Sequence, residues 1–176
     1  MSLIRPLTGE PLSLDLINTF WLDGVVPHDL LETDEGARAW LDEREVAFEP
    51  DLLPEIRAHL LVTRAALRGV LEAPHEAEQR RALNDVLARG RMVRFLGDDG
   101  PAEAVEVDAT WRPAWLAAND LLTLLRTAPG RLKKCADPAC VLHFLDTSPK
   151  NVRRWHDMKT CGNRAKAARH YHKTRG

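Results

Sequence analysis

The sequence lacks an apolar run of the length that a membrane-spanning helix requires, about 20 residues. Its first residues, MSLIRPLTGEPLSLDL, also lack the charged start, apolar centre and small-residue cleavage site of a secretory signal. We therefore expect a cytoplasmic protein that makes no contact with membranes. The 176 residues have the apolar and charged content of an ordinary globular protein, enough for one domain with a small additional module.

Cysteine is scarce, and its number is odd. Three cysteines cannot form a closed disulfide framework, and reduced thiols in the cytosol are typically metal ligands or nucleophiles. The sequence also has no glycine-rich loop that could cradle a phosphate, and no spacing that pairs a nucleophile with a base. We therefore expect no enzymatic activity.

The formal net charge of −1 hides a strong segregation of charge along the chain. Residues 131–176 hold twelve Lys and Arg against three Asp and Glu, a net charge of +9. The preceding 130 residues hold thirteen basic and twenty-three acidic residues, a net charge of −10. Such asymmetry suggests a module that binds a polyanion, attached to an acidic domain. All three cysteines lie in the basic segment, which argues against a merely solubilising tail.

The acidic part of the chain is predicted to be mostly helical. Apolar residues recur at helical spacing in five segments, 11–22, 33–45, 51–72, 74–90 and 112–128. Thr33 and Asp51 are candidate N-caps, and Pro74 suits a first helical position. Gly90 and Pro129–Gly130 are expected to end the helices that precede them.

Between the last two of these segments the hydrophobic period changes from helical to alternating. MVRFL and AVEVD flank GDDGPAE, a pattern that predicts a β-hairpin. Val93 and Phe95 lie on one side, with Val105 and Val107 on the partner strand. The predicted fold class is therefore α+β: a helix-rich N-terminal domain with a β-hairpin, followed by a small C-terminal module.

Arg64 lies on the apolar stripe of the 51–72 segment, where a guanidinium needs a partner. Asp15 and Asn18, on the largely apolar first helix, are the candidate partners. One interpretation is a buried ion pair that fixes how two helices dock. The other is a small-molecule pocket around Asp15, Asn18, Trp21 and Arg64, because convergent polar groups in an apolar setting are typical of ligand sites.

The basic segment contains two pairs of potential metal ligands. Cys135 and Cys140 form a C-x4-C pair, and after fifteen residues His156 and Cys161 form an H-x4-C pair. Two such pairs at this separation are typical of structural zinc sites, because each short loop supplies two donors to one side of the ion. A segment of 46 residues buries too little core to fold securely alone, so metal ligation would contribute to its stability.

Other histidines compete with His156 for the fourth position. His143 falls on a predicted strand, 141–145, and His170 and His172 lie nine and eleven residues past Cys161. The symmetry of the spacing favours His156. A catalytic zinc would keep only three protein ligands, whereas four well-spaced donors indicate a closed, structural site.

After Cys161 the sequence GNRAKAARHYHKTR predicts a helix, with the thiol near the positive end of the helix dipole, which favours the metal-binding thiolate. Basic residues in and before this helix are expected to contact DNA phosphates: Arg153, Arg154, Lys159, Lys166, Arg169 and Lys173. Arg164 could either bind a phosphate or brace the module by hydrogen bonds to backbone carbonyls.

Two alternatives to DNA binding stay open. The basic surface could dock on the acidic N-terminal domain, which would make the zinc module purely structural and leave a ligand-sensing or protein-interaction function. RNA is the other alternative, but we expect Phe144, Trp155 and Tyr171 to serve in packing rather than in stacking bases.

The CGNR motif at 161–164, with FLDTS at 144–148 and RRW at 153–155, resembles the CGNR zinc-finger family. LDLINTF at 14–20 and RAALR at 64–68, with the helix–hairpin–helix order, look like the ABATE domain that usually precedes this finger. The resemblance covers nearly the whole chain. It implies a helix-rich, ABATE-like regulatory domain at residues 1–130 and a CGNR-type zinc finger at residues 131–176, which we call the N-terminal domain and the finger module.

The resemblance implies a bacterial transcription regulator that binds DNA through a finger with structural Zn²⁺, and an N-terminal domain that senses a ligand. The expected partners are DNA and a small-molecule effector, and formation of a homodimer stays an open alternative. In the family pattern the residue after the Trp of RRW is usually Cys, whereas this chain has His156. Imidazole is an ordinary zinc donor, so the expected ligand set becomes three cysteines and one histidine.

Overall fold

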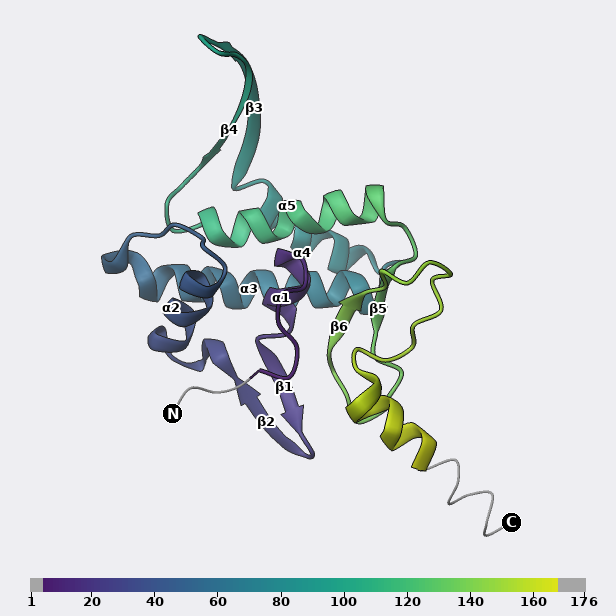
Figure 1. The fold of residues 1–176 in the computed structure, drawn as a ribbon. Helices are drawn as coiled ribbons and strands as arrows, with labels where there is room; N and C mark the ends of the chain where they lie inside the picture. Colours follow the sequence, from purple (N-terminus) through teal and green to yellow (C-terminus); the bar gives the residue numbers. More distant parts are fainter. Residues whose placement is uncertain (1–4, 168–176) are drawn as a thin grey trace.

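Helix α3 (Leu53–Glu72) is the central element of the part of the chain that the computed structural model describes, residues 5–167 (Figure 1). Four further helices contact it: α1 (Leu12–Ile17), α2 (Asp34–Glu43), α4 (Ala77–Leu87) and α5 (Arg112–Thr127). Its apolar residues recur at helical spacing, and their burial forms the middle of the core: Leu53, Ile56, Leu60, Leu67 and Val70.

None of the helices in the described range has the length and apolar content needed to cross a bilayer. Short 3₁₀ turns cover Leu30–Glu32 and Pro50–Leu52. A single π-helical turn covers Met158–Gly162 in the finger module and continues into a helix through residue 167.

Among residues 5–167 the strands pair only with their neighbours in sequence and form three two-stranded antiparallel sheets. Their bounds are β1 (Phe20–Asp23), β2 (Val26–Asp29), β3 (Gly90–Gly97), β4 (Gly100–Val107), β5 (Leu132–Lys134) and β6 (His143–Leu145). Helices and small separate sheets together make the fold mixed α+β, as the sequence predicts. The pair β5–β6 belongs to the finger module and packs beside α1.

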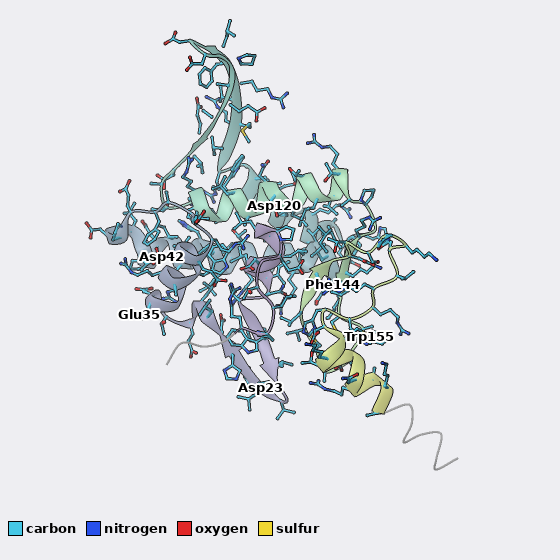
Figure 2. The ribbon with its side chains drawn as sticks, in the orientation of Figure 1. Asp23, Glu35, Asp42, Asp120, Phe144 and Trp155 are labelled. Atoms are coloured by element: carbon cyan, nitrogen blue, oxygen red, sulfur yellow. The ribbon has the colours of Figure 1, made fainter. Side chains whose placement is uncertain are left out.

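The predicted hairpin is confirmed, and it projects away from the helices (Figures 1 and 2). Opposite residues share a face in an antiparallel pair. Val93 faces Ala104 and Phe95 faces Ala102, whereas Val105 faces Met92. The valines of β4 therefore lie on the other face from Val93 and Phe95.

The predicted helices exist, and the Thr33 cap is confirmed, since its Oγ1 accepts from Gly36 N at 3.1 Å. The helix predicted over 11–22 is too long. The helix ends at Ile17, and Phe20 begins a strand. The sequence could not indicate this boundary, because a segment that is apolar on every side has no hydrophobic period that distinguishes a helix from a buried strand.

Three predicted helix ends are wrong. Asp51 lies in a 3₁₀ turn before α3 and does not cap it. Pro74 precedes α4, which begins at Ala77. Gly90 is not a helix stop but the first residue of β3, where an added Cβ would lie 2.8 Å from the Cβ of Val107. Glycine is required there by close packing.

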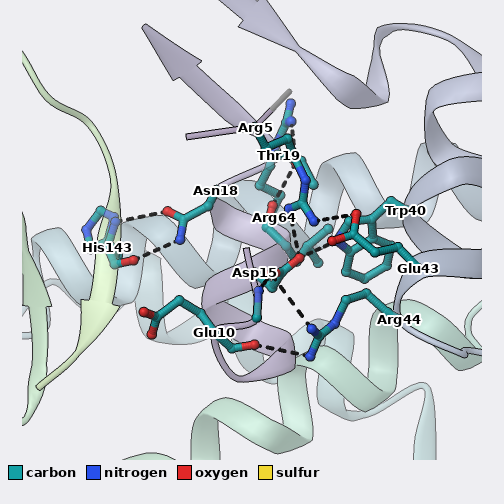
Figure 3. Close-up of polar contacts among 12 residues, drawn as sticks. Arg5, Glu10, Asp15, Asn18, Thr19, Trp40, Glu43, Arg44, Arg64 and His143 are labelled. Atoms are coloured by element: carbon teal, nitrogen blue, oxygen red, sulfur yellow. Dashed lines mark hydrogen bonds and ion pairs between the residues drawn. The ribbon is translucent and has the colours of Figure 1, made fainter. Parts of the chain in front are cut away.

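A buried ion pair around Asp15 fixes α1 against α2 (Figure 3). Arg5 Nη1 donates to Asp15 Oδ1 at 2.8 Å, and the indole Nε1 of Trp40 donates to the same oxygen at 2.9 Å. The Asp15 and Arg5 side chains are 0 % and 2 % exposed. A buried charge without its partner is strongly destabilising, so this cluster specifies one arrangement of the two helices.

Arg64 has a different partner from those predicted. Its guanidinium donates two hydrogen bonds to the Asp29 carboxylate, at 2.6 and 2.7 Å, and one to Thr19 Oγ1 at 2.9 Å. Burial alone would raise the pKa of Asp29, but these hydrogen bonds from Arg64 hold it below its usual value. Pairing with Asp15 or Asn18 was wrong, because Asp15 is already neutralised by Arg5. The ion pair with Asp29 instead joins α3 to β2.

Candidate metal centre

The structure brings the four sequence-predicted ligands together. The Sγ atoms of Cys135, Cys140 and Cys161 and a ring nitrogen of His156 all lie within 4.8 Å of one another. Cys140 Sγ is 3.5 Å from His156 Nδ1. The four side chains are between 3 and 9 % exposed, so the donors face one another in a space that excludes most water.

The first pair of donors is positioned by a turn that follows β5. Cys135 N donates to Leu142 O at 2.9 Å, which continues the β5–β6 pairing as far as the first ligand. Asp137 then forms the turn, since its Oδ1 accepts from Ala139 N at 3.0 Å and its carbonyl accepts from Cys140 N at 2.9 Å. This turn directs both thiols to the same side.

The second pair is positioned by the cap of the π-helical turn. Asp157 accepts hydrogen bonds from the backbone amides of Lys159 and Thr160, at 3.2 and 3.0 Å. The first of these bonds is the main reason that the pKa of Asp157 is lowered. Met158 packs directly on Gly162, since a Cβ added to this glycine would lie 2.7 Å from Met158 Sδ. The cap and this close packing place Cys161 opposite the first loop.

The donor set and one distance of the cluster fit a tetrahedral zinc ion. With Zn–S bonds of about 2.3 Å and Zn–N bonds of about 2.0 Å, tetrahedral angles place two sulfurs about 3.8 Å apart and a sulfur and a nitrogen about 3.5 Å apart. The distance between Cys140 Sγ and His156 Nδ1 matches the second value. Three thiolates and one imidazole also form a donor set that structural zinc sites use.

The ionisation of the thiols also indicates a cation site. Hydrogen bonding from Cys140, aided by His156, lowers the pKa of Cys135 to about 3. The hydrogen bond to Cys135 raises the pKa of Cys140, and burial raises that of Cys161 to about 12. Three thiols this close together repel one another when ionised, so all three become thiolates only beside a compensating positive charge. A divalent ion would stabilise all three thiolates, because the metal binds only the ionised form.

Arg153, predicted to contact nucleic acid, is engaged inside the finger module. Its guanidinium lies over the Phe144 ring at 4.5 Å and donates to the carbonyl oxygens of Trp155, at 2.9 Å, and of His156. These bonds fix the backbone that carries the histidine donor. Lys133 braces the same segment by donating to the Arg153 carbonyl at 3.2 Å.

Arg164, the arginine of the CGNR motif, pairs with Asp137 of the first loop at 3.1 Å. The Asp137 side chain is 5 % exposed, whereas that of Arg164 is 52 % exposed. The pair therefore links the helix that follows Cys161 to the turn between Cys135 and Cys140. Of the two roles considered for Arg164, its position fits bracing, although the bond goes to a carboxylate rather than to a carbonyl.

Three other predicted nucleic-acid contacts lie on the surface. Arg154, Lys159 and Lys166 are exposed, and none has an ion-pair partner between residues 5 and 167. The Arg154 guanidinium lies over the Trp155 ring at 5.1 Å. Arg169 and Lys173 lie outside the described residues. The described part of the finger module therefore has fewer exposed, unpaired basic side chains than its composition indicates.

The finger module docks on the N-terminal domain through β5 and β6. The side-chain amide of Asn18 pairs with the backbone of β6 as a neighbouring strand would. It donates to His143 O at 2.8 Å and accepts from His143 N at 2.9 Å (Figure 3). Glu10 accepts from Leu145 N at 2.8 Å, and Lys134 pairs with Glu72 of α3 at 2.7 Å.

The residues of the predicted small-molecule pocket are each engaged in contacts within the protein. Asp15 and Arg64 are used in the ion pairs described above, and Asn18 is used in docking. Trp21 packs against the three cysteines and Leu142, and its ring stacks on His28 at 5.2 Å. None of the four lines the cavities of about 440, 420, 540 or 610 Å³ found in the described chain. Each has a structural partner that accounts for its burial.

The residues that support the cluster differ in how far the sequence could indicate them. Asp137 carried a signal, because it stands inside the C-x4-C loop and its turn chemistry is local. Trp21 and Glu72 carried none, since their contacts with the finger module join residues more than 60 positions apart.

His143 is buried between the finger module and the N-terminal domain but is not part of the cluster. It is 2 % exposed, neither ring nitrogen has a hydrogen-bond partner among the described residues, and Nε2 lies 3.9 Å from a Glu72 oxygen. Burial, together with the nearby positive charge of Arg68, lowers its pKa from 6.5 to about 4. The folded protein therefore holds a neutral imidazole here.

We predict an acid-sensitive contribution to stability from His143. The unfolded chain binds the imidazole proton below about pH 6.5, whereas the folded chain binds it only near pH 4. Folding stability should therefore fall as the pH drops through this window, by up to about 3 kcal/mol at pH 4. Denaturant unfolding of the wild type and of His143→Leu should show this loss in the wild type alone. The exposed His75→Leu is the control, and equal pH profiles for all three proteins would contradict the assignment.

Comparison with known families agrees with this arrangement. Residues 131–174 match the family model of the CGNR zinc finger. Residues 10–128 match the ABATE family model, which is described as "Putative stress-induced transcription regulator". No curated protein matches the sequence. The ABATE match spans more than half of the 176 residues, so the chain belongs to the ABATE family and carries a CGNR zinc finger after that domain.

Proposed function

We propose that this protein is a transcription regulator that binds DNA through the finger module, and that one structural zinc ion holds this module together. The observation that carries the proposal is the cluster of four donors, which lies beside exposed cations in a CGNR finger. The description of the ABATE family supports the same class of function. Such a protein would be a regulator rather than an enzyme and would act in the bacterial cytoplasm, where the DNA lies.

Cys135, Cys140, His156 and Cys161 would hold the zinc ion. Four protein donors fill a tetrahedral shell, which leaves no position for water or substrate and argues for a structural site. Bound zinc would supply the positive charge that three adjacent thiolates require. Its binding free energy would add to the folding free energy of a module whose own apolar core is small.

The exposed cations support DNA as the partner. Docking on the N-terminal domain uses β5 and β6, whereas Arg154, Lys159 and Lys166 lie in the loop and helix after β6. The open charges therefore lie on other segments than the two strands whose residues bond to the N-terminal domain. Contacts from such side chains to phosphates would give affinity without sequence selectivity.

The alternative is a finger that is purely structural and serves a ligand-sensing or protein-interaction domain. The specific observation in its favour is the direct docking of the finger module on Glu72, Asn18 and Glu10 of the N-terminal domain. Ligand sensing by that domain is compatible with either function. The two differ in whether DNA binds, so the DNA experiment below decides between them.

The ligand set predicts one zinc ion per chain. His156→Ala removes a donor and should weaken zinc binding by at least about 100-fold, whereas His156→Cys supplies the donor usual in the family and should retain the ion. His143→Leu is the matched control, a buried finger histidine outside the cluster. Metal analysis and competition with a chromogenic chelator measure the affinities. Full, tight zinc binding by His156→Ala would rule out the proposed ligand set.

DNA binding is predicted to be strongly salt-dependent. On random genomic fragments, each of Lys159→Ala and Lys166→Ala should lower the slope of log affinity against log salt by about 1, because each removes one phosphate contact. Arg91→Ala, an exposed arginine of the projecting hairpin, should leave the slope unchanged. A chelator should abolish binding by the wild type. The absence of binding at low salt, or a flat salt dependence, would remove DNA as the partner and leave the structural alternative.

A further inference from the structure

A cavity of about 420 Å³ lies where the helices of the N-terminal domain meet the start of the finger module. Apolar side chains of α3, α4, α5 and β5 form most of its wall: Leu71, Leu83, Leu122, Leu125 and Leu132. Its volume lies within the range of small-molecule sites, about 300–1,000 Å³. The cavity is separate from the metal cluster and from the pocket predicted around Arg64.

The apolar wall of this cavity is partly open to solvent. Leu122 and Leu125 of α5 are 44 % and 41 % exposed, although they lie beside the main core. Exposed leucines are ordinary when they are scattered, but several that share one hollow mark a binding surface. An apolar molecule in this hollow would remove their side chains from water.

Two polar side chains of α4 complete the wall. Arg80 and Asn84 are one helical turn apart and therefore lie on the same face of the helix. Arg80 Nη1 donates to Pro74 O at 2.9 Å, and its guanidinium forms no ion pair with any described residue. The remaining guanidinium N–H groups, with the Asn84 amide, can donate to a ligand. A planar guanidinium matches a carboxylate best.

We propose that this cavity binds a small amphipathic carboxylate, with its apolar body against the leucines and its carboxylate on Arg80. The charge complementarity of Arg80 sets the class of ligand, because a neutral apolar molecule would leave the guanidinium unused. A second cavity, of about 440 Å³ between α3 and α4, fits this class less well. There Arg89 already lies over the Trp111 ring at 4.8 Å.

The position of the cavity connects it to the finger module. Gly130 and Leu132, which line it, belong to the segment that leads from α5 into β5. Two residues later Lys134 is anchored on Glu72, which follows the cavity residue Leu71. A ligand here would therefore press on the segment that orients β5. An effect of the ligand on the finger module would be regulatory only if the proposed function holds, whereas binding of the ligand does not depend on that function.

The experiment uses the zinc-loaded full chain, with 8-anilinonaphthalene-1-sulfonate as a fluorescent apolar anion and decanoate as competitor. Both should bind the wild type, with decanoate displacing the dye more effectively than 1-decanol. Arg80→Gln should weaken decanoate binding about tenfold and abolish its advantage over decanol, because the charge-assisted hydrogen bonds are lost. Leu125→Ser should weaken the binding of both molecules.

Two matched controls keep the test specific. Arg81→Gln changes the neighbouring exposed arginine of α4, which does not line the cavity, and Leu96→Ser changes a leucine of the hairpin that is 81 % exposed. Both should bind the dye and decanoate within twofold of the wild type. Failure of decanoate to displace the dye, or equal effects of Arg80→Gln and Arg81→Gln, would overturn the proposal. No DNA enters this measurement, so its outcome is independent of DNA binding.

Discussion

The finger module depends on holding three thiols and one imidazole within 4.8 Å of one another. Packed this closely, the thiols cannot all ionise without a cation: the pKa of Cys135 is lowered, whereas those of Cys140 and Cys161 are raised. The same sulfurs form a small apolar core with Trp21 and Leu142. Because Trp21 belongs to the N-terminal domain, the cluster is both the centre of the finger and part of its contact with that domain. Loss of the metal would therefore disturb both.

The basic charge of the finger module serves two separate purposes. Some basic side chains bond within the module and hold the loops that carry the metal donors: Lys133, Arg153 and Arg164. Others are exposed and without ion-pair partners among residues 5–167: Arg154, Lys159 and Lys166. A count of charges cannot separate the two groups, because the bracing arginines and the open ones are adjacent in sequence. The proposed DNA-binding surface therefore includes fewer basic residues than the charge pattern alone would indicate.

The local features of the fold could be predicted from the sequence, and the long-range ones could not. Cys spacing identified the donor cluster, and Thr33 identified a helix cap, because both patterns act over a few residues. Arg64 was correctly expected to be paired, but its partner Asp29 lies 35 residues away on a strand. Asn18 was expected in a pocket and instead bonds to His143, 125 residues away. Such pairings depend on how complete elements dock, which a one-dimensional pattern does not contain.

Our central proposal is that a metal ion held by the cluster would maintain the folded finger module. Amide hydrogen exchange of the full chain before and after zinc removal tests it most directly. The account predicts that chelation abolishes the protection of amides bonded within the module, such as Cys135 N and Asp146 N, while α3 stays protected. Unchanged protection of these finger amides after complete removal of the metal would contradict it.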